Sequence, residues 1–400
     1  MISRRMIGWG SQDCAIREIS AYGEKRATEI GADKVFNFTI GNPSVEPPDC
    51  VHESLERMLK ELPPEKLHSY TPAPGLESVR QSMADYLQRS FGVGYRAKDV
   101  YMTSGASSAL AILAYALLSP GDEMLTFTPC FSEYRLYTEA AGGRLVEVPT
   151  DEDSFQLDVG ALEKALTPRS AAVLVNSPNN PSGVIFRREK LEQLAELLER
   201  KSAEYGHTIY IIADEPYREL VYGDMEVPFI PAIYRNTVYC YSFSKTLSLP
   251  GERIGFIALH PELDDYASVY AAVCGAGRAL GYINASSIFQ LMVAECIGET
   301  VDISRYEYNR DFIYGALTEL GFSCVRPDGA FYLFVKAPGG DSRDFCRRAM
   351  EHNILLIPGD EFGRGGYARL AYCVTPERLH SSIPAFRALA EEYGLVSKTE

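Results

Sequence analysis

The sequence lacks a hydrophobic run long enough to cross a membrane. Its longest apolar stretch, Ala109–Leu118, is about half the ~20 residues that a transmembrane helix needs. Arg4 and Arg5 lie near the start of the chain, but Gly8 and Gly10 follow with polar neighbours, in place of the apolar core of a signal peptide. We therefore expect no membrane span and no cleaved leader.

An excess of basic charge is also missing. Lys and Arg number 39 against 54 Asp and Glu, which gives a formal net charge of −15 at pH 7. A surface this acidic repels nucleic-acid phosphates and anionic lipid, and the sequence predicts neither as a partner. Small anionic substrates are not excluded, because a few local Arg or Lys side chains dominate the potential within a short screening length.

The cysteines and histidines do not form the patterns of a disulfide framework or a metal site. The nine cysteines are odd in number and have no C-x-x-C spacing. The six histidines are dispersed, and no H-E-x-x-H motif occurs. These features favour reduced thiols in the cytoplasm, and we predict no bound metal.

Strand-like and helix-like segments alternate through the middle of the chain. Apolar runs of strand length recur there, and the amphipathic stretch 187–205 lies between two of them. This alternation predicts an α/β fold with a mostly parallel, seven-stranded sheet flanked by helices. The predicted strands are Val100–Thr103, Asp122–Phe127, Arg144–Val148, Ala171–Asn176, Ile209–Ala213, Thr237–Tyr241 and Ile254–Leu259.

The length of 400 residues exceeds what one hydrophobic core usually organises, so we expect two domains. After about Gly281 the pattern changes to two long helical stretches and then to short strands punctuated by Gly and Pro. We predict a large domain over residues 45–284. A smaller α+β domain would combine residues 1–44 with residues 285–400.

Polar residues follow two of the central strands. Ser177–Gly183 comes after one strand and Asp214 after another, and ligands of open α/β sheets bind outside the carboxyl ends of strands. A buried carboxylate there needs a cationic partner. The plainer interpretations stay open at this point, because Pro, Asn and Gly also make turns and Asp is a common helix N-cap.

Two further segments carry groups suited to an anion. Ser242–Gly255 places Lys245 directly after an apolar strand, among hydroxyls and ahead of Arg253. Thr103–Ser108 joins a strand to a helix through small residues, which lets backbone N–H groups approach a phosphate. An amine, a buried carboxylate, hydrogen-bond donors and a phosphate site together point to pyridoxal phosphate.

These motifs resemble those of the class I/II aminotransferases, the aspartate aminotransferase family of fold-type I pyridoxal-phosphate enzymes. The S-x-S-K-x-x-x-x-P-G-x-R-x-G stretch is the most specific of them, and the resemblance covers roughly residues 36–375. It implies the pyridoxal-phosphate-dependent transferase fold. The matching positions are Gly41-Asn42-Pro43, Tyr70, Gly75, Arg80, Ser104-Gly105-Ala106, Asn176–Gly183, Asp214–Tyr217, Ser242–Gly255 and Arg369.

The resemblance implies a role for each matching residue toward pyridoxal 5′-phosphate. Lys245 would hold the cofactor as a Schiff base and then move the substrate proton, while Asp214 would pair with the pyridine nitrogen. Tyr217 joins these two as the third predicted catalytic residue. The predicted cofactor-binding residues are Lys245, Gly105, Ala106, Ser107, Phe131, Asn180, Asp214, Tyr217, Ser242, Ser244, Arg253 and Tyr70.

The predicted substrate-binding residues are Gly41, Asn180, Arg278 and Arg369. Arg369 matches the arginine that forks the α-carboxylate, and Gly41 would lie near the same group. Arg278 is our candidate for a side-chain carboxylate, with a surface or interface arginine as the alternative. The sequence also departs from the family where Gly251-Glu252-Arg253 stands in place of G-W-R.

Tyr70 matches the tyrosine that reaches the phosphate of the neighbouring subunit, which implies a homodimer with shared active sites. A purely structural aromatic is the alternative there, as a core phenylalanine is at Phe131.

The predicted function is an aminotransferase of amino acid metabolism that works by a ping-pong cycle. It would move an amino group between an L-amino acid and a 2-oxo acid. Arg278 favours aspartate or another acidic donor, with alanine or an aromatic amino acid as alternatives. A carbon–sulfur β-lyase or a decarboxylase on the same scaffold is the alternative reaction. A transcriptional regulator is disfavoured, because it needs a basic helix-turn-helix module that the acidic chain does not offer.

Overall fold

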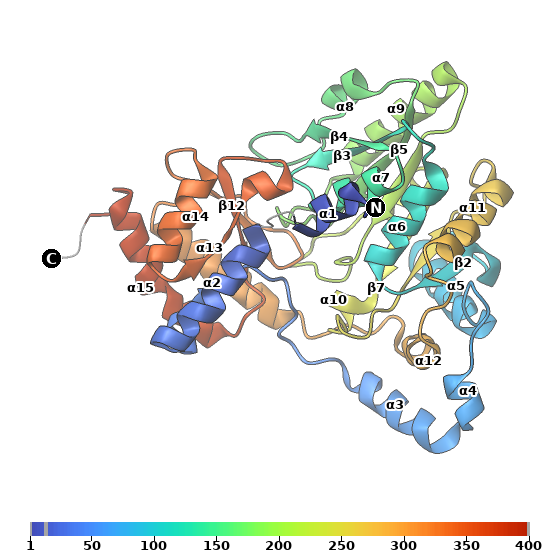
Figure 1. Ribbon diagram of the computed structural model, residues 1–400, viewed down its shortest axis with the longest axis horizontal. Coiled ribbons are helices and arrows are strands. Elements are labelled where there is room, and N and C mark those ends of the chain that lie inside the picture. Colours follow the sequence, from blue (N-terminus) through green and yellow to red (C-terminus); the bar gives the residue numbers. More distant parts are fainter. Residues whose placement is uncertain (1, 12–14, 398–400) are drawn as a thin grey trace. The chain divides into compact units, whose positions relative to one another are not determined.

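The computed structural model describes residues 2–11 and 15–397, and the chain forms two compact units (Figure 1). The larger unit comprises Pro43–Arg305 with Asp328–Ala330. The smaller unit comprises the chain up to Asn42, Tyr306–Pro327 and the residues from Phe331 onward. The domain division at residues 44 and 284 stays a prediction. In the described part of the chain, no helix is both long and apolar enough to span a bilayer.

A seven-stranded sheet forms the centre of the larger unit, with the strand order β2-β8-β7-β6-β5-β3-β4. Strand β8 runs opposite to the other six strands, which are parallel to one another in direction, so the predicted mostly parallel sheet is confirmed. The strands are β2 (Val100–Thr103), β3 (Glu123–Thr128), β4 (Arg144–Pro149), β5 (Ser170–Asn176), β6 (Tyr210–Asp214), β7 (Thr237–Ser242) and β8 (Gly255–Leu259).

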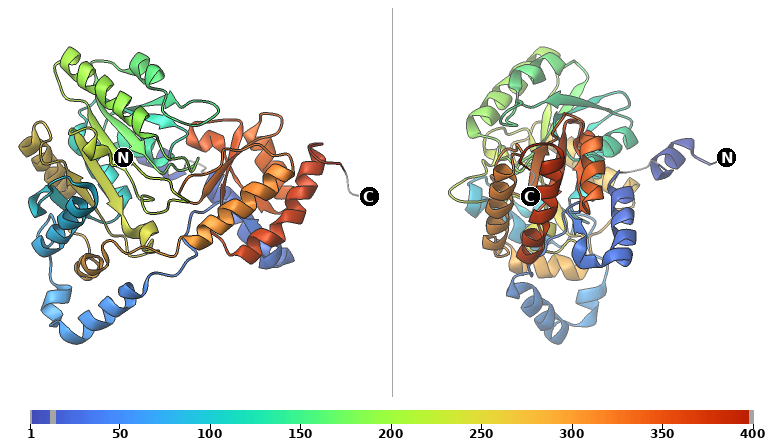
Figure 2. Two further views of the ribbon diagram at one scale, coloured as in Figure 1. Left: turned by 180° about the vertical axis from the view of Figure 1, so that it is seen from behind. Right: turned by 90° about the vertical axis from the view of Figure 1, so that its left-hand side faces the viewer.

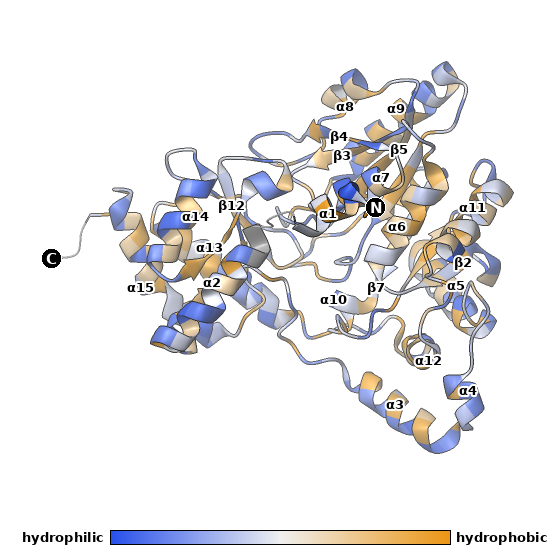
Figure 3. Cartoon of the chain, viewed as in Figure 1, coloured by the Kyte–Doolittle hydropathy of each residue, from blue (hydrophilic) through white to orange (hydrophobic). Residues whose placement is uncertain are grey.

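Helices flank this sheet, as Figures 1 and 2 show. Most are amphipathic, and Figure 3 shows hydrophilic and hydrophobic residues alternating around α3. The helices of the larger unit are α3 (Asp49–Glu61), α4 (Pro64–His68), α5 (Glu77–Phe91), α6 (Ala106–Leu117), α7 (Glu133–Ala140), α8 (Val159–Ala165), α9 (Arg188–Tyr205), α10 (Phe243–Thr246), α11 (Tyr266–Ala279) and α12 (Ser287–Cys296).

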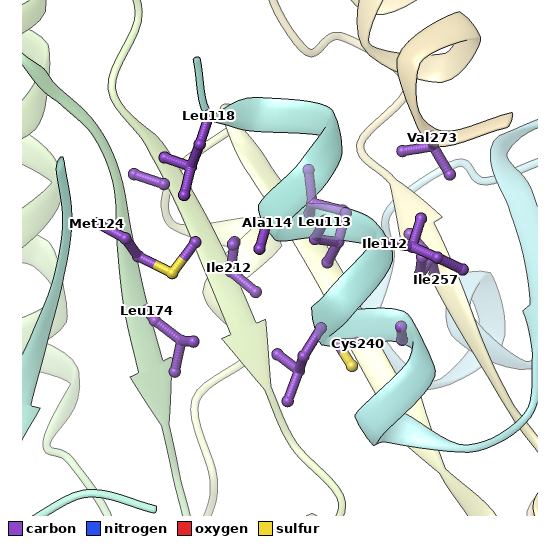
Figure 4. Packing of buried hydrophobic residues seen from close by; sticks show 14 of the residues in the cluster. Ile112, Leu113, Ala114, Leu118, Met124, Leu174, Ile212, Cys240, Ile257 and Val273 are labelled. Carbon is purple, nitrogen blue, oxygen red and sulfur yellow. The ribbon is translucent and has the colours of Figure 1, made fainter. Parts of the chain in front are cut away.

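Helix α6 is the exception, because it is apolar on nearly all sides. It packs against β7, β8 and α11, and Leu110, Ile112 and Leu113 are almost fully buried, whereas Leu117 at its end is partly buried. Figure 4 shows Ile112 of α6 close to Ile257 of β8 within this core. The buried helix fixes the position of its own first residues against the strand ends.

The smaller unit is α+β. Strand β1 (Phe36–Asn37) pairs with β10 (Ile354–Leu355), so the N-terminal and C-terminal segments lie side by side there. An antiparallel sheet follows the order β11-β12-β9. The remaining elements are β9 (Tyr332–Lys336), β11 (Ile357–Pro358), β12 (Tyr367–Ala371), α1 (Arg4–Ser11), α2 (Ala15–Ile30), α13 (Ser304–Glu319), α14 (Ser342–Glu351) and α15 (Pro376–Glu392).

Candidate active site

The ends of β5 and β6 place two polar residues opposite each other. Asn176 pairs with Asp214 in the register of these parallel strands, and its Nδ2 donates a hydrogen bond of 2.8 Å to the Asp214 backbone oxygen. Both side chains are buried. Asp214 is therefore held at the carboxyl edge of the sheet by neighbouring strand ends rather than by a helix cap.

The Asp214 carboxylate has an unusual environment for a charged group. Its Oδ2 accepts a hydrogen bond of 2.5 Å from the Tyr134 hydroxyl, whereas Oδ1 is buried and has no partner among the residues that the structure describes. Burial raises the pKa of Asp214 to about 6, although the Tyr134 hydrogen bond acts to lower it. A buried carboxylate oxygen without a partner is costly, so this site suits a ligand with a cationic donor.

The segment after β5 is both a turn and a buried polar structure. Asn176 Oδ1 accepts the backbone N–H of Asn180 at 2.8 Å, and Asn179 Oδ1 accepts the Ser182 hydroxyl at 2.7 Å. Asn180 itself is only 6% exposed. The turn interpretation of these residues is therefore correct, and it also fixes the backbone of Asn180 beside the strand end that precedes it.

Tyr217 belongs to the buried turn that follows Asp214. It is 5% exposed, and the backbone N–H of Leu220 donates to its carbonyl oxygen at 2.9 Å. The phenol of Tyr217 also raises the pKa of Tyr134 electrostatically. This influence indicates that the two phenols lie in the same buried region as Asp214.

Lys245 lies in the short helix α10 that begins where β7 ends. Ser242 caps this helix, because its Oγ accepts the backbone N–H of Ser244 at 3.3 Å. On the other side of Lys245, the Thr246 hydroxyl donates to Glu219 Oε2 at 2.7 Å. Lys245 is half-buried, so its backbone is fixed on both sides while its side chain remains partly accessible.

The start of α6 meets Arg253. Gly105 has φ of +83°, a conformation that favours glycine, and a Cβ atom there would lie 2.7 Å from Arg253 Nη2, so a larger residue would also displace the guanidinium. Arg253 Nη1 also donates to Ser244 Oγ at 3.2 Å. The guanidinium, the hydroxyl and the N-terminal end of α6 (Ala106 and Ser107) together form a site suited to an anion.

Three other predicted residues differ in their surroundings. The Phe131 ring makes an edge-to-face contact with Tyr134, with centroids 5.6 Å apart, so it belongs to the same region as the Asp214 carboxylate. Tyr70 is 97% exposed, and Arg278 is exposed in the last turn of α11. The structure does not bury either of them in the region of Asp214, and their roles stay predictions.

The smaller unit carries Arg369 and Gly41. Arg369 is 4% exposed, and its guanidinium carbon lies 4.8 Å from the ring centre of Tyr332 and 4.7 Å from that of Phe362. Its Nη2 donates to the Thr39 backbone oxygen at 2.5 Å. A Cβ on Gly41 would clash with Tyr332, which explains the glycine beside this buried arginine. The aromatic rings fix the plane of the guanidinium, as carboxylate recognition requires.

Residues 33–386 match the sequence pattern of the family described as aminotransferase class I and II. The chain belongs to this family. The aspartate aminotransferase of Thermotoga maritima is 31% identical over 387 residues, covering 96% of this chain and 97% of that protein. A probable aspartate/prephenate aminotransferase of Aquifex aeolicus is 30% identical and covers 90% and 91%.

Solved structures agree with this assignment. An amino transferase from Eubacterium rectale has a TM-score of 0.96 with 46% identity, covering 98% of this chain and 99% of that one. The aspartate aminotransferase of Thermus thermophilus with maleate has a TM-score of 0.84 with 27% identity, covering 97% and 99%. The protein is thus an aminotransferase, and these relatives support transamination over the lyase or decarboxylase alternative.

Sequence reasoning missed two residues of this aminotransferase site. Tyr134 follows Phe131 by one helical turn and contacts Asp214, which is far away in the sequence. Glu219 accepts hydrogen bonds from Thr246 and from the Tyr86 hydroxyl, the latter at 3.0 Å. Neither residue stands in a recognisable motif, so only the folded chain shows these contacts.

Proposed function

We propose that this aminotransferase uses pyridoxal 5′-phosphate to move an amino group between an L-amino acid and a 2-oxo acid in a ping-pong cycle. The observation that carries the proposal is the buried Asp214 carboxylate with one oxygen left unpartnered by the described residues. A pyridinium N–H is a cationic donor of the kind that this oxygen needs. The anion site at Gly105 and Arg253 supports the proposal independently.

The residues present fit the cofactor. Asp214 would hold the proton on the ring nitrogen, and Asn180 and Tyr217 would donate to the ring oxygen. Phe131 would cover one ring face. The phosphate would be bound by a set of backbone, hydroxyl and guanidinium donors: Gly105, Ala106, Ser107, Ser242, Ser244 and Arg253. When bound, the cofactor supplies the carbonyl carbon that accepts the amino group and a ring that withdraws electrons from the substrate Cα.

Lys245 would provide both the anchoring amine and the base of the reaction. Its Nζ would take the proton from the substrate Cα and hold it for the later proton return, and the bound cofactor would supply the carbon that receives it. The helix cap at Ser242 and the Thr246–Glu219 hydrogen bond support this role, because they fix the backbone on both sides of Lys245. A fixed backbone would keep Lys245 Nζ at a constant position relative to the substrate Cα.

Arg369 would bind the α-carboxylate that every amino acid and 2-oxo acid substrate carries. The Tyr332 and Phe362 rings support this role, because they leave the edge of the guanidinium as its hydrogen-bonding side. Gly41 would leave room for the carboxylate. We propose aspartate or another acidic amino acid as the donor, read by Arg278, since several relatives are named as aspartate aminotransferases. Aromatic donors are the alternative, because one relative is named for aromatic amino acids.

The exposed phenol of Tyr70 supports a homodimer in which this residue completes the phosphate site of the other subunit. At 97% exposure, it has almost no surroundings within its own chain. Light scattering of the purified protein measures the mass directly, and a monomer would contradict this part of the proposal. A cytoplasmic location is also proposed, supported by the eight described cysteines being free thiols.

Visible absorbance of the purified protein with added pyridoxal phosphate tests the function. We expect a cofactor band that an amino acid bleaches and that a 2-oxo acid restores, and the effective amino acid identifies the donor. Lys245→Ala should lose the protein-linked band, whereas Lys164→Ala on the exposed surface of α8 should keep it. Pyruvate and ammonia formed without any oxo acid would instead indicate the lyase, and no band at all would refute the proposal.

A further inference from the structure

Tyr134 makes a short, buried hydrogen bond with the Asp214 carboxylate. Its side chain is 1% exposed in α7, and its hydroxyl donates to Oδ2 at 2.5 Å. Burial and the Asp214 charge raise the pKa of Tyr134 well above its usual value. The phenol therefore keeps its proton throughout the physiological range and is a permanent donor.

Four ionisable neighbours of this pair are acidic, so none of the four stabilises a negative Asp214. Glu215 follows Asp214 in the chain, and Cys240 comes from the end of β7; both have acidic ionisable side chains that interact unfavourably with a negative Asp214. Cys130 and Tyr217 likewise act on Tyr134 as acidic groups. The Tyr134 hydrogen bond, by contrast, acts to lower the pKa of Asp214.

We propose that Tyr134 is a positioning residue for the cofactor, acting through Asp214. Its hydroxyl occupies Oδ2 and so leaves Oδ1 as the oxygen that accepts the ring N–H. It also keeps the carboxylate less basic, which holds the shared proton on the ring nitrogen instead of on Asp214. The proposal rests on the proposed function, because it concerns the partner of the pyridine nitrogen.

The same segment orients a second group. Phe131 and Tyr134 lie one turn apart and pack edge to face, with ring centroids 5.6 Å apart. Phe131, which would cover the cofactor ring, and Tyr134, which orients the Asp214 carboxylate, therefore lie in one short segment of the chain. A rigid segment from Phe131 to Tyr134 would hold both the residue on the cofactor ring face and the residue that contacts Asp214.

The test compares Tyr134→Phe with the matched control Tyr234→Phe. Tyr234 is equally buried, and its hydroxyl donates to the Ile209 backbone oxygen at 2.8 Å, so the control also removes a buried hydroxyl and its hydrogen bond. In the cofactor-free protein, infrared difference spectra would follow protonation of the Asp214 carboxyl with pH. The Asp214 band is identified by its loss in Asp214→Asn. We expect Tyr134→Phe to shift the midpoint upward by about one pH unit and Tyr234→Phe to leave it unchanged.

The cofactor-bound protein gives a second readout. Tyr134→Phe should release pyridoxal phosphate about tenfold faster and lower kcat, with little change in KM for either substrate. In an Asp214→Asn background the same substitution should have no further effect on cofactor release, because its effect acts through the carboxylate.

Equal protonation midpoints in Tyr134→Phe and the wild type would overturn the proposal, as would an additive effect on cofactor release in the Asp214→Asn background. If no variant, including the wild type, binds pyridoxal phosphate, the proposed function fails and this proposal fails with it. An unchanged carboxyl titration in a protein that binds the cofactor normally refutes the role of Tyr134 alone.

Discussion

Replacing Asp214 by Asn should stabilise the cofactor-free protein at neutral pH. Burial raises the pKa of Asp214 to about 6 from an ordinary 3.8, so the ionised side chain disfavours the folded state. The difference of about 2 units corresponds to about 3 kcal/mol at pH 7, using 1.36 kcal/mol for each unit. Asparagine has no charge and still offers Tyr134 a carbonyl acceptor, so most of this energy should be regained.

The stabilisation by Asp214→Asn keeps its sign at every pH, but its magnitude depends on pH. The folded pKa lies above the unfolded one, so the penalty is fully present above about pH 7 and disappears as the pH falls through 6 toward 3.8. Asp214→Asn should therefore gain about 3 kcal/mol at pH 7 and less than about 1 kcal/mol at pH 4.

Thermal unfolding of the cofactor-free protein measures this effect. At about 2 °C for each kcal/mol in a unit of this size, Tm should rise by roughly 6 °C at pH 7. Asp153→Asn, at an exposed position, serves as the control and should leave Tm unchanged. Pyridoxal phosphate should stabilise the wild type more than Asp214→Asn, since the cofactor supplies the missing partner. A variant that is less stable than the wild type at pH 7, or a gain that does not depend on pH, would refute the reasoning.

Two other substitutions test the two units separately. Arg369→Lys should lower kcat/KM for amino acid and oxo acid alike by roughly 100-fold, because a single ammonium replaces the forked guanidinium; a loss confined to one substrate would contradict a role in binding the shared carboxylate. Arg218→Met should destabilise the larger unit by about 3–5 kcal/mol in denaturant unfolding. It leaves Glu215 buried without its ion-pair partner, and burial already raises the pKa of that carboxyl to about 7. Adding Glu215→Gln should restore most of the lost stability. The Arg218 guanidinium also lies 4.2 Å from the centre of the Phe91 ring. A double variant as unstable as Arg218→Met would show that the loss of this contact matters more than the unpaired charge.

Much of the fold could be predicted because local hydrophobic patterns ended at clear polar signals. The strand predicted at Ile209–Ala213 is β6 at Tyr210–Asp214, and Val100–Thr103 is β2 without change. Buried parallel strands are continuous apolar runs, which explains this agreement. The antiparallel direction of β8 was not predictable in this way, because an apolar run is the same in either direction.

The candidate site could be predicted only where a residue stands in a motif. Lys245 and Asp214 follow strands in recognisable stretches, and the structure has Asp214 at the end of β6 and Lys245 in the short helix α10 after β7. Tyr134 and Phe362 are single aromatic residues among polar and charged neighbours in the sequence, and their importance depends on partners that are distant in the sequence. Hydrogen bonds and ring contacts of this kind depend on tertiary packing, so local pattern carries no signal of them.

The reversed direction of β8 has a consequence for how this enzyme can change over time. Because β8 starts at the edge where β7 ends, Ser242 faces Gly255 across the two strands, and one short loop returns the chain from Lys245 to Arg253. Lys245 and Arg253 thus belong to the same connection between two adjacent antiparallel strands, β7 and β8. An insertion or deletion in this connection would displace both residues. We therefore expect its length to stay constant among descendants of this chain, and changes of length to occur in other loops.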